Sequence, residues 1–125
     1  MPPLPEPPAR LTEPEIRRLV ALFYARIRQD PELGPIFNRA IHDWPDHLAK
    51  LTDFWSAMML GTGRYQGNPM QAHARQRAHL SPALFNRWLA LWRETSAEIL
   101  SPAAAAAVQE RAARMASSLQ RGLAL

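Results

Sequence analysis

Apolar residues recur along most of this chain at the spacing of one helix face, and they predict an all-helical protein. A first helix is expected from about residue 12 to residue 28, where Thr12 and Glu15 form a capping box at its start. Its apolar stripe consists of Ile16, Leu19, Val20, Phe23 and Ile27. Tyr24 lies on the edge of that stripe, where its hydroxyl either bonds a nearby backbone carbonyl or points into a cavity.

Three further long helices follow from the same periodicity, and each is preceded by a recognisable start signal. Pro45 opens a helix that runs to about Leu60, and Ser81-Pro82 and Ser101-Pro102 open two more, the last of which ends near Gly122. Between the first two helices the chain stops and restarts, and Ile36, Phe37 and Ile41 are expected to point inward. The polar stretch from residue 74 to residue 79 is expected to be irregular. No segment alternates with period two for long enough to form a strand, so we predict four main helices around an irregular centre.

Two histidines stand at the ends of the stretch from residue 47 to residue 73. The apolar face that begins there consists of His47, Leu51, Phe54, Trp55 and Met58. Gly61, Gly63, Gly67 and Pro69 then turn the chain back towards His73. Two imidazoles beside bulky apolar side chains suit a flat apolar cofactor with a metal at its centre better than they suit a bare zinc ion.

Composition narrows the possible chemistry. The 125 residues form one domain, with a proline-rich arm over residues 1–11 that is expected to be disordered and a folded domain over residues 12–125. There is no cysteine, so disulfides, thiolate metal sites and iron–sulfur clusters are excluded. The first ten residues lack the apolar centre of a signal peptide, and we expect a cytoplasmic protein.

The chain is basic, with a net charge of +4, and this raises the question of nucleic-acid binding. Its arginines are scattered through every segment and are not clustered among aromatic residues, which indicates a solvated basic surface and no nucleic-acid partner. No run of about 18 apolar residues is present, so no membrane span is expected.

Other functions that depend on histidine need further residues that this sequence does not contain. His42-Asp43 is similar to part of a metal-dependent phosphohydrolase pattern, but no histidine precedes it and no aspartate follows Asp53. No two histidines are four residues apart, which removes the common zinc pair of a helix. A histidine on an apolar face is often only a hydrogen-bonded core residue, so a haem-free helical interaction module stays open as the alternative to a haem protein.

Four blocks of the sequence, in this order and spacing, resemble the group III truncated haemoglobins of bacteria. The blocks are FYARIRQDPELGPIF, DWPDHLAKLTDFW, YQGNPMQAH and FNRWLALW, and the similarity spans about residues 15 to 119. The resemblance implies a truncated globin fold, which is a 2-over-2 helical sandwich around haem b.

The resemblance also implies roles for individual residues. His73 matches the proximal ligand of the iron, and it is preferred to His79 because it follows the Pro-Met turn. Tyr24 and Trp88 match the distal hydrogen-bond donors, which makes the ligand-facing role of Tyr24 the favoured one. His47 matches the distal gate, where it donates to the ligand, swings out or binds iron. Phe37 matches the phenylalanine that packs on the porphyrin, and the other candidate haem contacts are Leu51, Phe54, Tyr65 and Met70. Lys50, Arg75 and Arg77 are candidates for the propionates because of their charge and their proximity to His47 and His73, not because of the resemblance.

The function implied by the resemblance is reversible binding of O₂, NO or CO. A tight polar distal pocket suits redox chemistry or sensing better than bulk oxygen transport, and NO dioxygenation and a peroxidase-like reaction both stay open. Such chemistry calls for a reductase partner, and we expect the protein to be a monomer.

Overall fold

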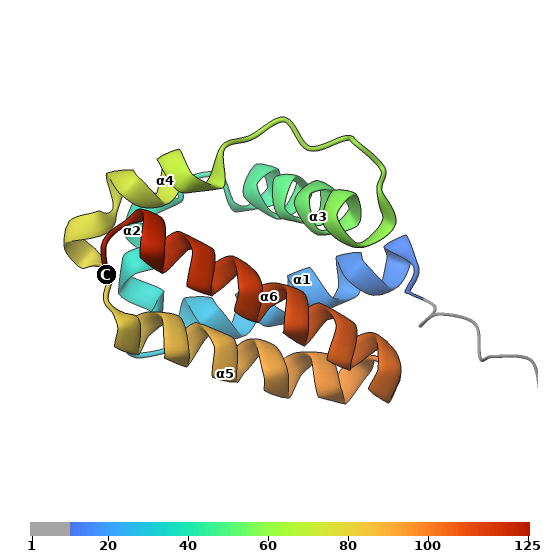
Figure 1. Ribbon diagram of the computed structural model, residues 1–125. Helices are drawn as coiled ribbons and strands as arrows, with labels where there is room; N and C mark the ends of the chain where they lie inside the picture. The colour runs from blue at the N-terminus through green and yellow to red at the C-terminus, as the bar shows by residue number, and fades with distance from the viewer. Residues whose placement is uncertain (1–10) are drawn as a thin grey trace, which may run out of the picture.

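A computed structural model of the protein describes residues 11–125, and the fold is built from helices alone in that part of the chain (Figure 1). The predicted arm falls almost wholly outside these residues, and its last residue, Leu11, is packed against the main core. The elements in chain order are α1 (Glu13–Gln29), α2 (Gly34–Ala40), α3 (Trp44–Leu60), α4 (Pro69–Arg75), the 3₁₀ helix η1 (Arg77–His79), α5 (Pro82–Ile99) and α6 (Pro102–Gly122).

The long helices start where the sequence predicts, and a polar side chain caps each start. Thr12 accepts a hydrogen bond from the amide of Glu15, and the capping box is complete. Ser81 and Ser101 cap α5 and α6 in the same way, each with a proline in the first turn. Gly61 ends α3 with a φ of 72°, which glycine adopts without steric cost.

The prediction of an irregular segment over residues 74–79 was wrong. Asn68 caps the start of α4. The helix continues through Arg75, and a 3₁₀ turn follows it. The amide of Gln76 bonds the carbonyl of His73 at 2.9 Å, and that of His79 bonds Gln76 at 2.8 Å. Short helices of this kind are easily missed in a sequence, since an isolated turn is stable only through its caps and its packing.

Packing arranges these helices around α1 and α6. Helix α1 lies against α2, α3 and α5, while α6 lies against α5 and α4 (Figure 1). One core cluster is centred on α1, α5 and the first half of α6, and a smaller one joins Phe85 to the end of α6. No helix among residues 11–125 is both long enough and apolar enough to cross a bilayer.

The centre of the larger core is an aromatic cluster. The ring of Phe23 meets Tyr24, Trp88 and Trp92 edge-on, with ring centroids 4.9, 5.2 and 4.9 Å away. Edge-to-face contacts of this kind stabilise a core by about 0.5–1.5 kcal/mol beyond simple burial. The indole of Trp92 also donates a hydrogen bond to the carbonyl of Val108 at 3.1 Å, which joins α5 to α6.

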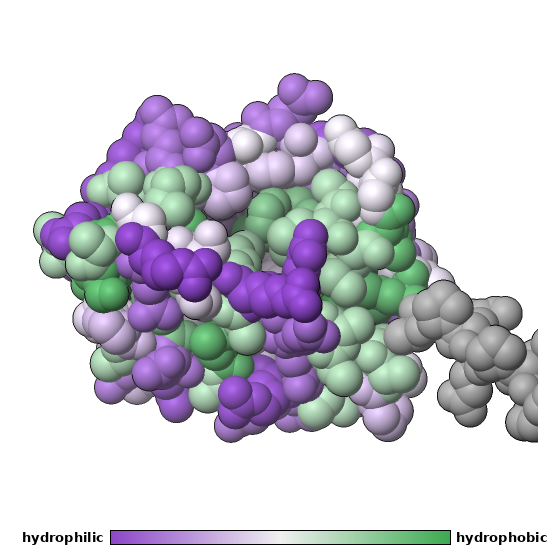
Figure 2. All heavy atoms as spheres, in the orientation of Figure 1, coloured by the Kyte–Doolittle hydropathy of each residue, from purple (hydrophilic) through white to green (hydrophobic). Residues whose placement is uncertain are grey.

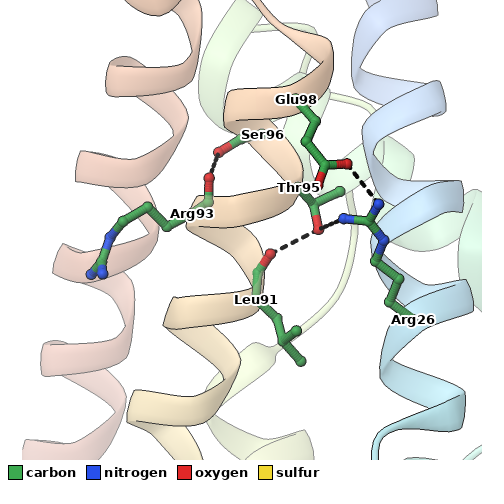
Figure 3. Close-up of polar contacts among 6 residues, drawn as sticks. All are labelled: Arg26, Leu91, Arg93, Thr95, Ser96 and Glu98. Carbon is green, nitrogen blue, oxygen red and sulfur yellow. Dashed lines mark hydrogen bonds and ion pairs between the residues drawn. The ribbon is translucent and has the colours of Figure 1, made fainter.

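Polar contacts at the edge of this core set the register of α1 on α5 (Figure 3). Arg26 donates to the hydroxyl of Thr95 at 3.1 Å and to the carboxylate of Glu98 at 2.6 Å. The ion pair is partly exposed and therefore stabilises the fold only weakly. The Thr95 hydroxyl also donates to the carbonyl of Leu91 at 2.8 Å, so this fully buried polar group is satisfied.

A buried carboxylate fixes the corner between α1 and α2. Asp30 accepts hydrogen bonds from the amides of Glu32 and Leu33, at 3.1 and 2.9 Å, and from the guanidinium of Arg87 on α5, at 3.0 and 2.6 Å. Burial raises the pKa of the Asp30 carboxyl, but these bonds and the charge of Arg87 outweigh it and hold the pKa below its ordinary value.

We expect Asp30→Ala to lower the free energy of unfolding by about 2–3 kcal/mol, the scale of hydrogen bonds to a charged group whose partners become unpaired. Because the folded pKa is depressed, the stabilisation is complete above the ordinary value of 3.8 and is lost as pH falls through the folded pKa. Urea unfolding of parent and variant at a series of pH values measures this difference.

Glu110→Ala is the matched control, since Glu110 makes an exposed ion pair with Arg114 within α6. Its effect should stay within about 0.5 kcal/mol. An equal effect of the two substitutions at neutral pH would contradict the role given to Asp30.

Candidate functional site

Tyr24 is the point where three helices meet. It lies on α1 with only 4% of its surface exposed, and its ring contacts Phe37 of α2 with centroids 5.8 Å apart. The rings of Trp44 and His47, both on α3, lie 6.2 and 6.3 Å away. Two predicted site residues, Phe37 and His47, are thus brought to Tyr24 from other elements.

The phenol of Tyr24 has no protein acceptor within residues 11–125, so a local backbone partner, one of the two interpretations open from the sequence, is not formed. Burial raises the pKa of Tyr24 well above its ordinary value, and the indole N–H of Trp88, which donates towards the phenol, opposes that rise. The hydroxyl is therefore neutral at physiological pH and keeps its proton as a hydrogen-bond donor.

His47 stands at the rim of the same cluster, in the first half of α3. Its ring is half-buried and meets Trp44 edge-on at 5.8 Å. Burial and the nearby charge of Lys50 lower the pKa of His47, against an opposing effect of Asp46. The imidazole is therefore neutral at pH 7. The stripe predicted for this helix is half-buried rather than buried, and only Trp55 among its five residues is fully enclosed.

His73 is oriented by its own helix. Its Nδ1 lies 2.7 Å from the carbonyl oxygen of Pro69, one turn earlier in α4. A carbonyl only accepts, so Nδ1 carries the proton and the lone pair of Nε2 is left for another partner. The ring lies nearly parallel to Phe85 of α5, with centroids 6.3 Å apart and planes at 28°. This is the arrangement that commonly fixes a metal-binding imidazole.

Large apolar side chains near these residues are left only partly covered by the protein. On α3, α4 and α5 the half-buried ones include Leu51, Phe54, Met58, Met70, Leu84 and Trp88. A cavity of about 370 Å³ opens between α3, α4 and α6, lined by Met58, Met70, Met115 and Leu119 together with Ser118, Arg111 and Arg114. Figure 2 shows apolar atoms exposed on this face between α3 and α6, with strongly hydrophilic side chains among them. The volume lies in the range of small-molecule sites.

The donor groups do not suit a bare metal ion. Within residues 11–125 no three histidine or carboxylate side chains converge in a way that could hold one. A single free imidazole nitrogen, on a helix that also lines the cavity through Met70, instead suits a metal that brings its own planar ligand.

The basic residues proposed from the sequence lie in different surroundings. Lys50 is exposed and pairs with Asp46 at 3.0 Å, and Arg75 is exposed on α4. Arg77 is directed to the C-terminal end of α6, where its Nε donates to the carbonyl of Leu123 at 2.7 Å. His79 is exposed beside Arg39, at least 3.4 Å away, whereas His73 is half-buried.

Several residues of the site were missed in the sequence. Trp44 was not singled out in the sequence, yet it is buried and also covered by the guanidinium of Arg28 at 4.6 Å. Phe85 was also not singled out in the sequence, although it is buried and contacts His73. The arginines that line the cavity, Arg111 and Arg114, share a face of α6 with Met115, and that spacing is the signal that could have found them.

Tyr65 lies in the segment between α3 and α4. Its ring packs on Phe54 with centroids 5.0 Å apart, and its phenol lies against the backbone at Gly67, where a Cβ atom would clash with it. Tyr65 therefore extends the aromatic packing of α3 to the outside of the molecule.

Comparisons with known proteins agree with this geometry. Residues 12–121 match the family model described as bacterial-like globin. The chain is 34% identical over 120 residues to the group 3 truncated haemoglobin of Campylobacter jejuni, which covers 90% of this chain and 91% of that protein. The crystal structure of a group III truncated haemoglobin from the same organism superposes with a TM-score of 0.82 over 91% of this chain and 92% of that one, at 35% identity. The all-α truncated globin fold predicted from the sequence is confirmed, and the chain belongs to the bacterial-like globin family as a group III truncated haemoglobin.

Proposed function

We propose that this globin binds O₂, NO or CO at the iron of a haem b held by His73, and that it uses these ligands in redox chemistry or sensing rather than in bulk oxygen transport. Membership of the globin family indicates haem-based binding of small diatomic ligands, which weighs against the haem-free interaction module. The observation that carries the finer proposal is the bond from His73 Nδ1 to the Pro69 carbonyl, because it leaves Nε2 as a ligand.

The residues present fit a haem. A cavity lies between α3, α4 and α6, and the aliphatic and thioether part of its lining suits a porphyrin. The phenol of Tyr24 is a second indication, because its proton is donated to no acceptor within residues 11–125 and is left for a ligand in the site. Haem iron, when bound, supplies the coordination position at which a diatomic ligand attaches.

Tyr24 and Trp88 would act on the bound ligand as hydrogen-bond donors. Both donors are neutral, and the phenol lies in a site from which water is largely excluded, so each hydrogen bond to a partly negative ligand is worth about 1–3 kcal/mol. Donors of this kind favour O₂ over CO, because bound O₂ carries more negative charge. They also retain the ligand, which is the opposite of what an oxygen carrier needs.

Retention of O₂ suits an NO dioxygenase. The same two donors suit a peroxidase-like reaction, because a hydrogen bond to a bound ligand polarises its O–O bond. Either activity needs electrons from a reductase or from a small reducing molecule. The partner, a monomeric state and a cytoplasmic location stay predictions from the sequence.

The remaining pocket residues are assigned by position. Phe37, Leu51, Phe54 and Met70 would contact the porphyrin, and Tyr65 would lie at its edge. Lys50 and Arg75 are exposed, and Lys50 could turn towards the propionates by leaving its exposed ion pair with Asp46, whereas Arg77 would first have to leave the carbonyl of Leu123. Arg111 and Arg114, which line the cavity, are further candidates for these carboxylates.

We expect His73→Ala to abolish the Soret band of the purified protein, because His73 is the one histidine of α4 and its Nε2 is left free to bind iron. The absorption spectrum of the ferric, ferrous and CO forms measures the result. His79→Ala is the matched control and should keep the band, since His79 is exposed and away from the cavity. Loss of the Soret band in His79→Ala but not in His73→Ala would instead assign His79 as the iron ligand.

Tyr24→Phe should raise the O₂ dissociation rate about tenfold, the scale of one lost hydrogen bond, while the buried ring keeps its packing. Trp88→Phe should act in the same direction. With both donors removed, the O₂ complex should oxidise faster than in the parent. Stopped-flow dissociation rates that do not change in either single variant would contradict the distal role of these residues.

We expect His47 to make stability depend on pH in a definite direction. Its folded pKa lies below the ordinary 6.5, so the folded state binds fewer protons than the unfolded chain as pH falls through that value. Lowering the pH from about 7 to about 5 should therefore destabilise the parent more than His47→Gln, as measured by urea unfolding. Equal losses in the two proteins would show that the imidazole is not held in its neutral form.

A further inference from the structure

Five aromatic rings form an unbroken file from the ligand side of the site to the segment between α3 and α4. Trp88 and Trp92 are stacked with centroids 5.5 Å apart and planes at 8°. Trp92 and Trp55 are stacked at 4.4 Å and 22°. Phe54 then lies 5.7 Å from Trp55 and 5.0 Å from Tyr65. A single phenyl ring therefore separates the last indole from the phenol of Tyr65.

Burial changes along this file in a regular way. The two inner indoles, Trp55 and Trp92, are 2% and 1% exposed, so solvent molecules do not reach them. The two ends, Trp88 and Tyr65, are half-buried, and each is accessible from a different place. Trp88 meets the phenol of Tyr24 at the ligand side, whereas Tyr65 lies in the segment between α3 and α4.

We propose that this aromatic file conducts single electrons from Tyr65 to Trp88, so that Tyr65 is a surface oxidation site for phenolic donors. The inference rests on the proposed function for its oxidant, which is hydrogen peroxide reduced at the haem. Indole and phenol rings give up one electron far more readily than phenyl or aliphatic groups. Phe54 therefore only fills the space between Trp55 and Tyr65, and Trp88, Trp92, Trp55 and Tyr65 are the sites at which an electron is lost.

The electrons and protons of the reaction balance. Reduction of one hydrogen peroxide to two waters consumes two electrons and two protons. Each electron leaves Trp88 and is replaced in turn from Trp92, Trp55 and Tyr65. The oxidised Tyr65 releases its phenolic proton to solvent and becomes a neutral radical. A phenolic donor then returns an electron and a proton to Tyr65, and two such donors are oxidised to phenoxyl radicals for each peroxide.

The surroundings of the rings agree with this direction of transfer. The indole N–H of Trp92 bonds only the carbonyl of Val108, which is too weak a base to remove its proton, so an oxidised Trp92 is restored by an electron alone. Tyr24 also lies near Trp88, but with 4% of its surface exposed it is less accessible to a donor in solution than the half-buried Tyr65. Gly67 leaves room for the Tyr65 phenol to lie along the chain, where water reaches it.

The first test uses the full-length Tyr24→Phe protein, in which Tyr65 is the one tyrosine left. Azidyl radicals produced by pulse radiolysis oxidise tryptophan, and the transient spectrum then reports transfer to tyrosine. We expect a tyrosyl radical to form at a rate that does not depend on protein concentration. Adding Trp92→Phe should remove most of that transfer. Trp44→Phe is the matched control and should leave it unchanged, because Trp44 is outside the file.

A tyrosyl yield unaffected by Trp92→Phe, in a variant whose helix content is normal, would overturn the proposal. Trp55→Phe removes the other inner indole and provides a second break, should Trp92→Phe fail to fold. Transfer that persists through that variant would count equally against the inference.

The second test adds hydrogen peroxide to the haem-loaded protein with a nitroso spin trap, and mass spectrometry locates the adduct. The expected site is Tyr65, with loss of the adduct in Tyr65→Phe and a reduced yield in Trp92→Phe. Adducts confined to Tyr24 would overturn the proposal. A protein that takes up no haem would remove the proposed function, and the radiolysis experiment would still decide whether the file conducts.

Discussion

The edge-on packing of Phe23 against Trp88 and Trp92 is the contact on which the rest of this molecule depends. It locks α1 onto α5 and thereby fixes the rotation of α1 about its own axis. Because successive helix residues point about 100° apart, the next side chain, Tyr24, must then face α2 and α3. The position of the Tyr24 phenol is thus a consequence of how the core is packed.

The histidine side of the site depends on weaker attachments. Helix α4 has seven residues, none of them fully buried, and it reaches the body of the protein mainly through α6. Met70 lies against Gly122, where any larger residue would clash with its thioether. Arg77 bonds the carbonyl of Leu123 just beyond. A short helix held in this way is the kind of element that a bound cofactor would stabilise, since ligand binding to the folded state adds to its stability.

Two buried polar groups show how differently a fold and a site treat such groups. Asp30 is fully satisfied by two amides and a guanidinium, and it serves as a structural corner. Tyr24 is equally enclosed, yet its phenol donates to nothing within residues 11–125. In a protein core the first arrangement is the stable one, whereas the second is retained where a ligand completes it. The aromatic file adds a third arrangement, in which contact between rings rather than hydrogen bonding connects the site to the surface.

The sequence by itself determined the helical class, the starts of the four long helices and the family, because these depend on local spacing, on caps and on blocks of matching residues. It also singled out Tyr24, His47, His73 and Trp88. Tertiary structure alone decided that α4 extends through Arg75, that Trp44 and Phe85 belong to the site, and that Arg77 is directed to Leu123. It also decided that three separate segments line up their rings from Trp88 to Tyr65. The physical reason is that a periodic pattern specifies which face of a helix is covered, while the residue that covers it comes from another element, whose distance and rotation no local pattern records.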